Sequence, residues 1–189
     1  MKELTILMFC IIAIFIYMNF IRKSLYLDKI QAKNGKKYFV RNLPDKNEAA
    51  NKLARLGDSL QSLIDSLSDD KMSDYIQKLK ESFNSDYITE NIPGSMYVAY
   101  SVNKGEELSI CIREKNTEKF IDDNTITFVA IHELSHIMTP ETGHTKLFWE
   151  NMKWLLEKAS SIGIYMPVDY SQSPVEYCGM DINSTPMNI

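Results

Sequence analysis

Residues 126–144 read ITFVAIHELSHIMTPETGH, and this stretch governs the interpretation of the whole chain. Asp123 or Asn124 can cap a helix that continues through the apolar residues to about position 138. His132 and His136 lie four residues apart, so on that helix their imidazoles stand one above the other on the same face. Both rings can therefore reach a single metal ion.

Glu133 follows His132 directly and is therefore rotated away from the two imidazoles. From that position it can take a proton from a water molecule beside the metal, as a general base does, instead of binding the ion. Zinc lowers the pKa of its water to about 7 and polarises a scissile carbonyl, so no protein nucleophile is needed. The pattern predicts Zn²⁺ as cofactor and Glu133 as the catalytic residue of a zinc metallopeptidase.

A catalytic zinc site needs a third protein ligand and one open position. The chain contains three histidines in all, and the last of them, His144, follows Gly143, which allows the chain to turn back. We therefore predict that His144 completes the site with His132 and His136. Some zinc peptidases use a carboxylate instead, which leaves as alternatives Glu141, Asp169 and Glu176.

The carboxyl-terminal part of the chain contains further residues with suitable chemistry. A tyrosine hydroxyl can donate a hydrogen bond to an oxyanion, a methionine can lie beneath a metal, and a cysteine can bind one. The residues of these types are Tyr165, Tyr170, Tyr177, Met166 and Cys178. Such side chains more often pack as ordinary core or surface residues, so none is included in the predicted site.

The amino-terminal residues 4–21, LTILMFCIIAIFIYMNFI, contain no charge. As a helix rising about 1.5 Å per residue, they nearly cross a hydrocarbon core of roughly 30 Å, so we predict a transmembrane anchor. A cleaved signal peptide would need small residues at a cleavage site, and these are missing. Lys and Arg concentrate after the span, in a basic linker over residues 22–43, which predicts a single-pass membrane protein whose carboxyl-terminal side faces the cytoplasm.

The charge limits the classes of binding partner, and the cysteine content limits the redox compartment. Residues 42–189 contain 13 Lys and Arg against 23 Asp and Glu, a formal charge of −10. Nonspecific nucleic-acid binding needs a basic surface that neutralises phosphates, so we expect a protein or peptide partner and not a nucleic acid. Cys10, Cys111 and Cys178 are too few for a disulfide framework and indicate a reducing compartment.

Hydrophobic spacing predicts one α+β domain over residues 44–189. We expect helices at about 45–67, 72–83, 123–138 and 144–159, a β-hairpin with strands at 96–102 and 108–112, and an irregular segment at 163–189. The first helix has a stripe of leucines too short for a coiled coil, so it should pack on its own domain. The stripe consists of Leu53, Leu56, Leu60, Leu63 and Leu67.

The motif resembles the zincin metallopeptidases, and within them the SprT-like and WLM-type groups, in which HExxH is followed by a nearby Gly-His and an apolar-aromatic helix. The resemblance covers about residues 97–158 and is carried by His132, Glu133, His136, Gly143, His144, Leu147, Phe148 and Trp149. It implies an α+β zincin-like fold with a small antiparallel sheet, whose edge binds an extended substrate by strand addition. The chain is also similar to uncharacterised proteins of large DNA viruses.

These features together predict a membrane-anchored zinc endopeptidase. Members of the resembled groups cleave proteins crosslinked to DNA, but the acidic charge of residues 42–189 argues against that substrate class here. The alternative is a catalytically inactive zinc-binding module with a structural or interaction role in a membrane or virion. Glu133 favours the enzyme, because a purely structural site has no use for a carboxylate beside His132.

Overall fold

The computed structural model describes residues 5, 7–11, 14, 17, 24–102 and 105–187. Within these residues no helix combines the length and the apolar character needed to cross a membrane. A span takes about 20 predominantly apolar residues, and helix α2 (Lys46–Ser66), which has 21, carries charged residues along its length. This finding contradicts the predicted single-pass membrane protein with a cytoplasmic domain. Much of the predicted anchor at 4–21 lies outside the described residues.

A five-stranded mixed sheet forms one layer of the domain, in the order β1-β2-β3-β5-β4. The β1–β2 and β4–β5 pairs are antiparallel, whereas β3 pairs in parallel with both β2 and β5, so the expected small antiparallel sheet is instead a mixed one. The predicted hairpin is confirmed as β4–β5, and β4 lies at an edge of the sheet. The strands are β1 (Leu27–Gln31), β2 (Lys37–Arg41), β3 (Ile88–Glu90), β4 (Ala99–Val102) and β5 (Glu107–Ile110).

The predicted basic linker over residues 22–43 was wrong in its main part, because it contains β1 and β2. In β2, Tyr38 and Val40 are buried, whereas the alternating residues Lys37 and Phe39 face outward. This alternation is the period-two pattern of a half-buried strand. The lysines therefore occupy the solvent-facing side of a hairpin, and the folded domain begins well before residue 44.

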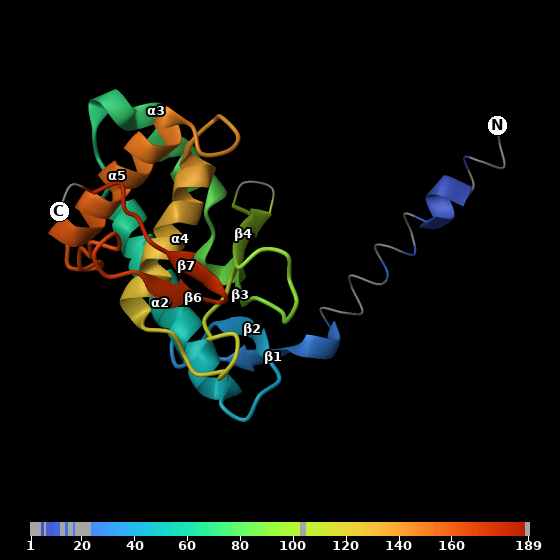
Figure 1. Cartoon of the computed structure of the whole chain (residues 1–189). Helices are drawn as coiled ribbons and strands as arrows, with labels where there is room; N and C mark the ends of the chain where they lie inside the picture. The colour runs from blue at the N-terminus through green and yellow to red at the C-terminus, as the bar shows by residue number, and fades with distance from the viewer. Residues whose placement is uncertain are drawn as a thin grey trace.

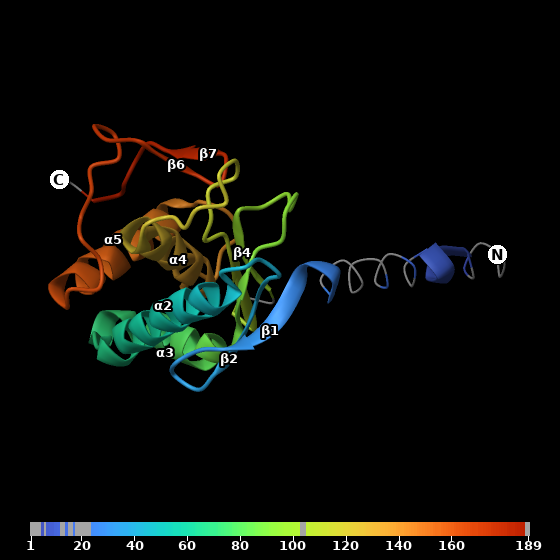
Figure 2. The same ribbon diagram turned by 90° about the horizontal axis from the view of Figure 1, so that it is seen from below.

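Four α-helices gather on one side of the sheet, as Figures 1 and 2 show. All four were predicted from hydrophobic spacing, and they are α2, α3 (Ser73–Ser82), α4 (Asp123–Met138) and α5 (Lys146–Ser161). Two short 3-10 turns, Asp70–Met72 and Ser85–Tyr87, precede α3 and β3. The leucine stripe of α2 is buried within its own domain, as expected from its short length.

Helix α4 forms the centre of the helical layer, with contacts to α2, α3, α5 and the β4–β5 hairpin. It begins after Asp122, whose Oδ1 accepts a hydrogen bond from the Thr125 N–H at 2.8 Å. Its apolar residues point in nearly every direction, and Ala130, Ile131 and Leu134 have no exposed surface. A helix that is apolar on most sides must be buried, so α4 is a fixed platform for the residues that it carries.

The carboxyl-terminal segment, predicted to be irregular, contains a second small sheet formed by β6 (Val175–Tyr177) and β7 (Met180–Ile182). Cys178 lies in the turn between these strands and forms a disulfide with Cys111, which directly follows β5. This disulfide removes the basis for the reducing compartment that was inferred from the cysteine content. Their proximity depends on two loops that bring together residues 67 positions apart.

Candidate metal centre

The end of α4 and the start of α5 position three histidines. His132 and His136 lie one turn apart on α4, and His144 comes from the loop that joins α4 to α5. In that loop Gly143 has a φ of 82°, a left-handed conformation that glycine adopts without steric cost. Thr145 then caps α5 through its side-chain oxygen, which accepts a hydrogen bond from the Phe148 N–H at 3.3 Å. His144 is thereby held next to a defined helix start.

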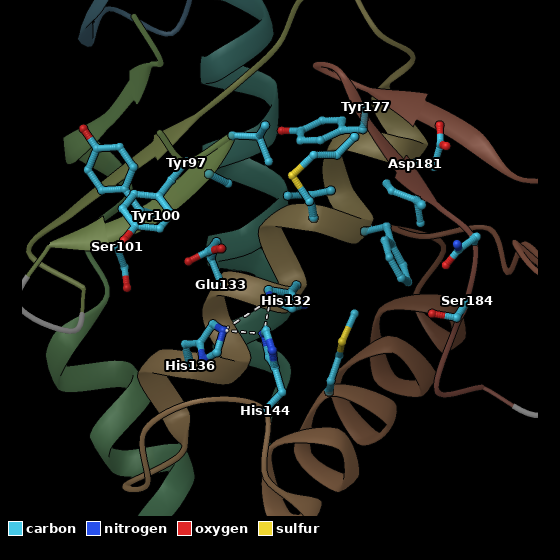
Figure 3. A pocket seen from close by; sticks show the side chains of 18 of the residues that line it. Tyr97, Tyr100, Ser101, His132, Glu133, His136, His144, Tyr177, Asp181 and Ser184 are labelled. Carbon is cyan, nitrogen blue, oxygen red and sulfur yellow. Dashed lines mark hydrogen bonds between the residues drawn. The ribbon is translucent and has the colours of Figure 1, made fainter. Parts of the chain in front are cut away.

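The three imidazoles point their Nε2 atoms at one another, as Figure 3 shows. The Nε2 distances are 3.2 Å between His132 and His136, 3.1 Å between His136 and His144, and 3.0 Å between His144 and His132. These nitrogens form a nearly equilateral triangle, and together they could hold a metal ion.

The donor set fits zinc. Each ring nitrogen is either a donor or an acceptor, so three mutually facing nitrogens cannot all satisfy one another by hydrogen bonding. Zinc binds histidine nitrogen at about 2.0–2.1 Å, which in a tetrahedron separates two nitrogens by about 3.4 Å. The observed separations of 3.0–3.2 Å match this value within a few tenths of an ångström.

Burial keeps the imidazole of His132 neutral. It lowers the pKa of His132 from 6.5 to about 3, with smaller contributions from the neighbouring His136 and His144. A neutral imidazole keeps the lone pair that a metal requires. The environment of His132 therefore favours the metal-binding form across the physiological pH range.

Phe148 forms an apolar floor beneath the metal centre. Its ring has no exposed surface, and its centroid lies 4.3 Å from that of His136, 4.8 Å from that of His144 and 4.9 Å from that of His132. A buried hydrogen bond from Asn151 Nδ2 to Thr139 Oγ1, at 2.9 Å, ties α5 to the end of α4. Packing and polar contacts thus fix the angle between the rings on α4 and the one in the loop.

Replacing Phe148 with leucine is expected to weaken zinc binding about tenfold, because changes in the shell around metal ligands typically cost 10- to 100-fold in affinity. Leucine fills much of the same volume, so the chain should remain folded. Competition with a chromophoric chelator measures the affinity. An affinity equal to that of the unaltered chain would show that the apolar floor does not orient the histidines.

Glu133 is buried beside the histidines, with 8% of its surface exposed. Burial raises its pKa from 4.5 to about 7, although a hydrogen bond from the Ser101 backbone works in the opposite direction. Ser101 belongs to the edge strand β4, and Figure 3 shows it next to the Glu133 carboxyl group. The carboxylate is thus held between the metal centre and the edge of the sheet, with a pKa suited to exchanging protons near neutral pH.

The raised pKa of Glu133 predicts a pH-dependent stability of the metal-free chain. Between pH 4.5 and about 7 the folded state keeps a proton that the unfolded chain releases, so stability falls as pH rises through this window. Glu133→Gln removes that loss and should stabilise the chelator-treated chain by about 3 kcal/mol at pH 8 but by less than about 1 kcal/mol at pH 5. Urea unfolding of both chains at the two pH values measures the difference, and an equal difference at both would contradict the prediction.

The metal centre opens into a cleft with a volume of about 650 Å³. One wall consists of β4 and residues 96–98 before it, and the opposite wall consists of β7 and residues 183–184 after it. Figure 3 shows the histidines between Ser101 on one side and Asp181 and Ser184 on the other. The metal position therefore opens onto the β4 edge of the sheet.

The alternative third ligands do not reach the metal centre. The residues that line the cleft and those that converge on the metal position do not include Glu141, Asp169 or Glu176. Glu141 and Glu176 are exposed, and Asp169 is partly buried, where its Oδ1 accepts a hydrogen bond from the Ser171 N–H at 3.0 Å. The geometry thus favours His144 over these carboxylates.

The other candidates occupy structural positions. Tyr165 and Tyr170 pack against Phe128, with ring centroids 6.0 and 4.7 Å from it, and burial raises the pKa of both hydroxyls. Tyr177 lines the cleft, but its hydroxyl donates a hydrogen bond to the Cys111 carbonyl at 2.6 Å. Met166 is 71% exposed and does not line this cleft, and Cys178 is in the disulfide.

Comparison with known proteins identifies relatives over most of the chain. A family model described as the WLM domain matches residues 33–173. An uncharacterised protein of Acanthamoeba polyphaga mimivirus is 34% identical over 153 residues, which cover 78% of this chain and 78% of that protein. An uncharacterised protein of Invertebrate iridescent virus 6 is 36% identical over 69 residues, or 35% of this chain and 38% of that protein. The similarity to proteins of large DNA viruses is confirmed.

Solved structures support the same assignment at the level of the fold. The crystal structure of Wss1 from Saccharomyces cerevisiae matches with a TM-score of 0.52 at 19% sequence identity, covering 65% of this chain and 86% of that one. This identity is low, so the likeness bears on the fold alone. The family model, in contrast, spans strands β2 to β5 and the histidine motif. The chain therefore belongs to the WLM domain family, a SprT-like family of zincin-type metallopeptidases.

Proposed function

We propose that this chain is a zinc-dependent endopeptidase, with His132, His136 and His144 as metal ligands and Glu133 as general base. The observation that carries the proposal is the convergence of three ring nitrogens within 3.0–3.2 Å in an open cleft, beside a buried carboxyl group. A structural zinc site usually has four protein ligands, whereas a catalytic one has three and an open position. The present set corresponds to the catalytic arrangement.

The residues of the cleft provide the proton transfers that peptide hydrolysis requires. Zinc, when bound, would polarise the scissile carbonyl and lower the pKa of a water molecule to about 7. Glu133 takes a proton from the attacking water and delivers it to the leaving amine nitrogen. The hydrogen bond from the Ser101 backbone orients the carboxylate for both transfers.

The edge strand favours an extended polypeptide as substrate. Val98 accepts a hydrogen bond from the Cys111 N–H across the β4–β5 pair, so in this register Ala99 and Ser101 direct their backbone groups away from β5. Ser101 uses its N–H for Glu133. The N–H and C=O of Ala99 and the C=O of Ser101 are thus directed toward a strand added at this edge.

Metal removal and restoration test the proposal. The chain of residues 1–189 should bind one zinc ion and cleave casein, lose the cleavage when a chelator removes the metal, and recover it when zinc is added back. A chain that binds zinc and shows no cleavage of casein or of itself would instead favour the inactive zinc-binding module. A chain that cleaves equally well without metal would contradict the proposed mechanism.

A further inference from the structure

One part of the cleft is mainly apolar and lies away from the metal centre, along α4 toward its start. We call this part the apolar subsite. Its lining residues come from α4 and from the β6–β7 hairpin, and they are Phe128, Val129, Tyr177, Met180 and Ile182. Phe128 and Val129 lie one helical turn before His132, so they face the same cleft. The Tyr177 hydroxyl is engaged with the Cys111 carbonyl, so this side chain presents its ring to the cleft.

The position of the apolar subsite along β4 follows from three hydrogen bonds. Tyr177 binds the Cys111 carbonyl at 2.6 Å, and the Cys111 N–H binds the Val98 carbonyl at 2.9 Å. The hairpin therefore lies beside the Val98 end of the edge. Glu133, in contrast, is bound to Ser101, three residues further along. At about 3.3 Å per strand residue, the reacting groups and the apolar subsite are separated by about 10 Å or less.

The side of the scissile bond that meets the apolar subsite depends on the direction of the substrate strand, which we take to be antiparallel to β4. A strand that pairs antiparallel with β4 runs from the Ser101 end toward the Val98 end. The peptide bond held at Glu133 is then followed, on its carboxyl side, by residues that lie next to the apolar subsite. A substrate side chain on that side of the scissile bond enters an apolar environment.

We propose that the apolar subsite selects a large apolar side chain, such as leucine or phenylalanine, on the carboxyl side of the scissile bond. This inference rests on the proposed endopeptidase function and adds the substrate preference of the same cleft. Transfer of such a side chain from water is favourable, whereas a carboxylate placed there would lose its hydration beside Phe128 and Val129. Discrimination in an apolar pocket of this kind typically reaches about 10-fold or more in kcat/KM.

Cleavage of defined peptides tests the preference. The zinc-loaded chain is incubated with alanine peptides that carry Leu, Phe, Ala or Asp at one central position, and mass spectrometry locates each cut. We expect cuts immediately before or one residue before Leu or Phe, at least about tenfold faster than for Ala, and little cutting next to Asp. Equal rates for all four peptides, or a preference on the amino side of the cut, would overturn the proposal.

A binding measurement separates this inference from the proposed activity. The same peptides are titrated into zinc-loaded Glu133→Gln, which lacks the general base and keeps the cleft. Binding of the Leu peptide about tenfold more tightly than the Asp peptide supports the apolar subsite, even if the unaltered chain cleaves nothing. Equal binding of the Leu and Asp peptides would overturn the subsite even if casein is cleaved.

A matched pair of methionine variants tests the assignment to the β6–β7 hairpin. Met180 lines the cleft and is 56% exposed, whereas Met166 is 71% exposed and lies outside that cleft. Met180→Glu should reduce the preference for Leu over Ala at least several-fold, and Met166→Glu should leave it unchanged. Both positions are exposed, so both chains should fold. Retention of the full preference in Met180→Glu would overturn the role of the hairpin.

Discussion

Glu133→Gln is expected to reduce peptide hydrolysis by about 1,000-fold while leaving the zinc content unchanged. General acid–base groups typically contribute 10²- to 10⁴-fold to a rate. Glutamine has nearly the same shape and can still accept the hydrogen bond from Ser101, but it cannot take up a proton. The three histidines remain in place, so metal binding should be retained. Steady-state cleavage of a fluorogenic peptide, together with metal analysis of the same sample, measures both effects.

The matched control is Glu141→Gln. This carboxylate is exposed in the loop between α4 and α5 and does not line the cleft. Its loss should change neither hydrolysis nor zinc content. Hydrolysis by Glu133→Gln within tenfold of the unaltered chain would contradict the general-base role, and loss of zinc in Glu141→Gln would reopen the question of the third ligand.

The helical layer was predictable because its signals are local. Helix α4 combines an aspartate cap, a continuous apolar run and a proline shortly after its end, so its bounds follow from neighbouring residues. The β1–β2 hairpin was not predicted, although buried and exposed residues alternate along β2. The many lysines of this segment favoured a solvated linker over a strand. The burial of Tyr38 and Val40 depends on packing against α2. Strand burial of this kind is a tertiary property, and periodicity over five residues indicates it only weakly.

The candidate site likewise has some features that follow from local sequence and others that depend on tertiary structure. The helical spacing of His132, Glu133 and His136 places them together without further information. His144 was predicted from the scarcity of histidine, and the structure brings its Nε2 to within 3.1 Å of the other two. The contact of Glu133 with Ser101 depends on the register of β4 beside α4, and the wall formed by β7 depends on a segment with three-residue strands. Neither of these features has a local signal in the sequence.

Removal of the Cys111–Cys178 disulfide is expected to lower the free energy of unfolding by about 4 kcal/mol, the chain-entropy value for a loop of this length. β6 and β7 pair only with each other among the described strands, so the disulfide and the Tyr177 hydrogen bond are strong links between this hairpin and the main sheet. The double variant Cys111→Ser/Cys178→Ser should therefore unfold at lower urea concentration. It should also lose part of the preference for apolar residues, because Met180 and Ile182 move with the hairpin.

Cys10→Ser is the matched control, since Cys10 is exposed and unpaired. Its urea midpoint should equal that of the unaltered chain. A dithiol reductant should lower the midpoint of the unaltered chain and of Cys10→Ser, and it should leave that of the double variant unchanged. The double variant should still bind zinc, because the three histidines and Phe148 belong to α4, α5 and the loop between them. An unchanged midpoint in the double variant would show that the hairpin is held by its packing alone, whereas loss of zinc would show that the hairpin also supports the metal centre.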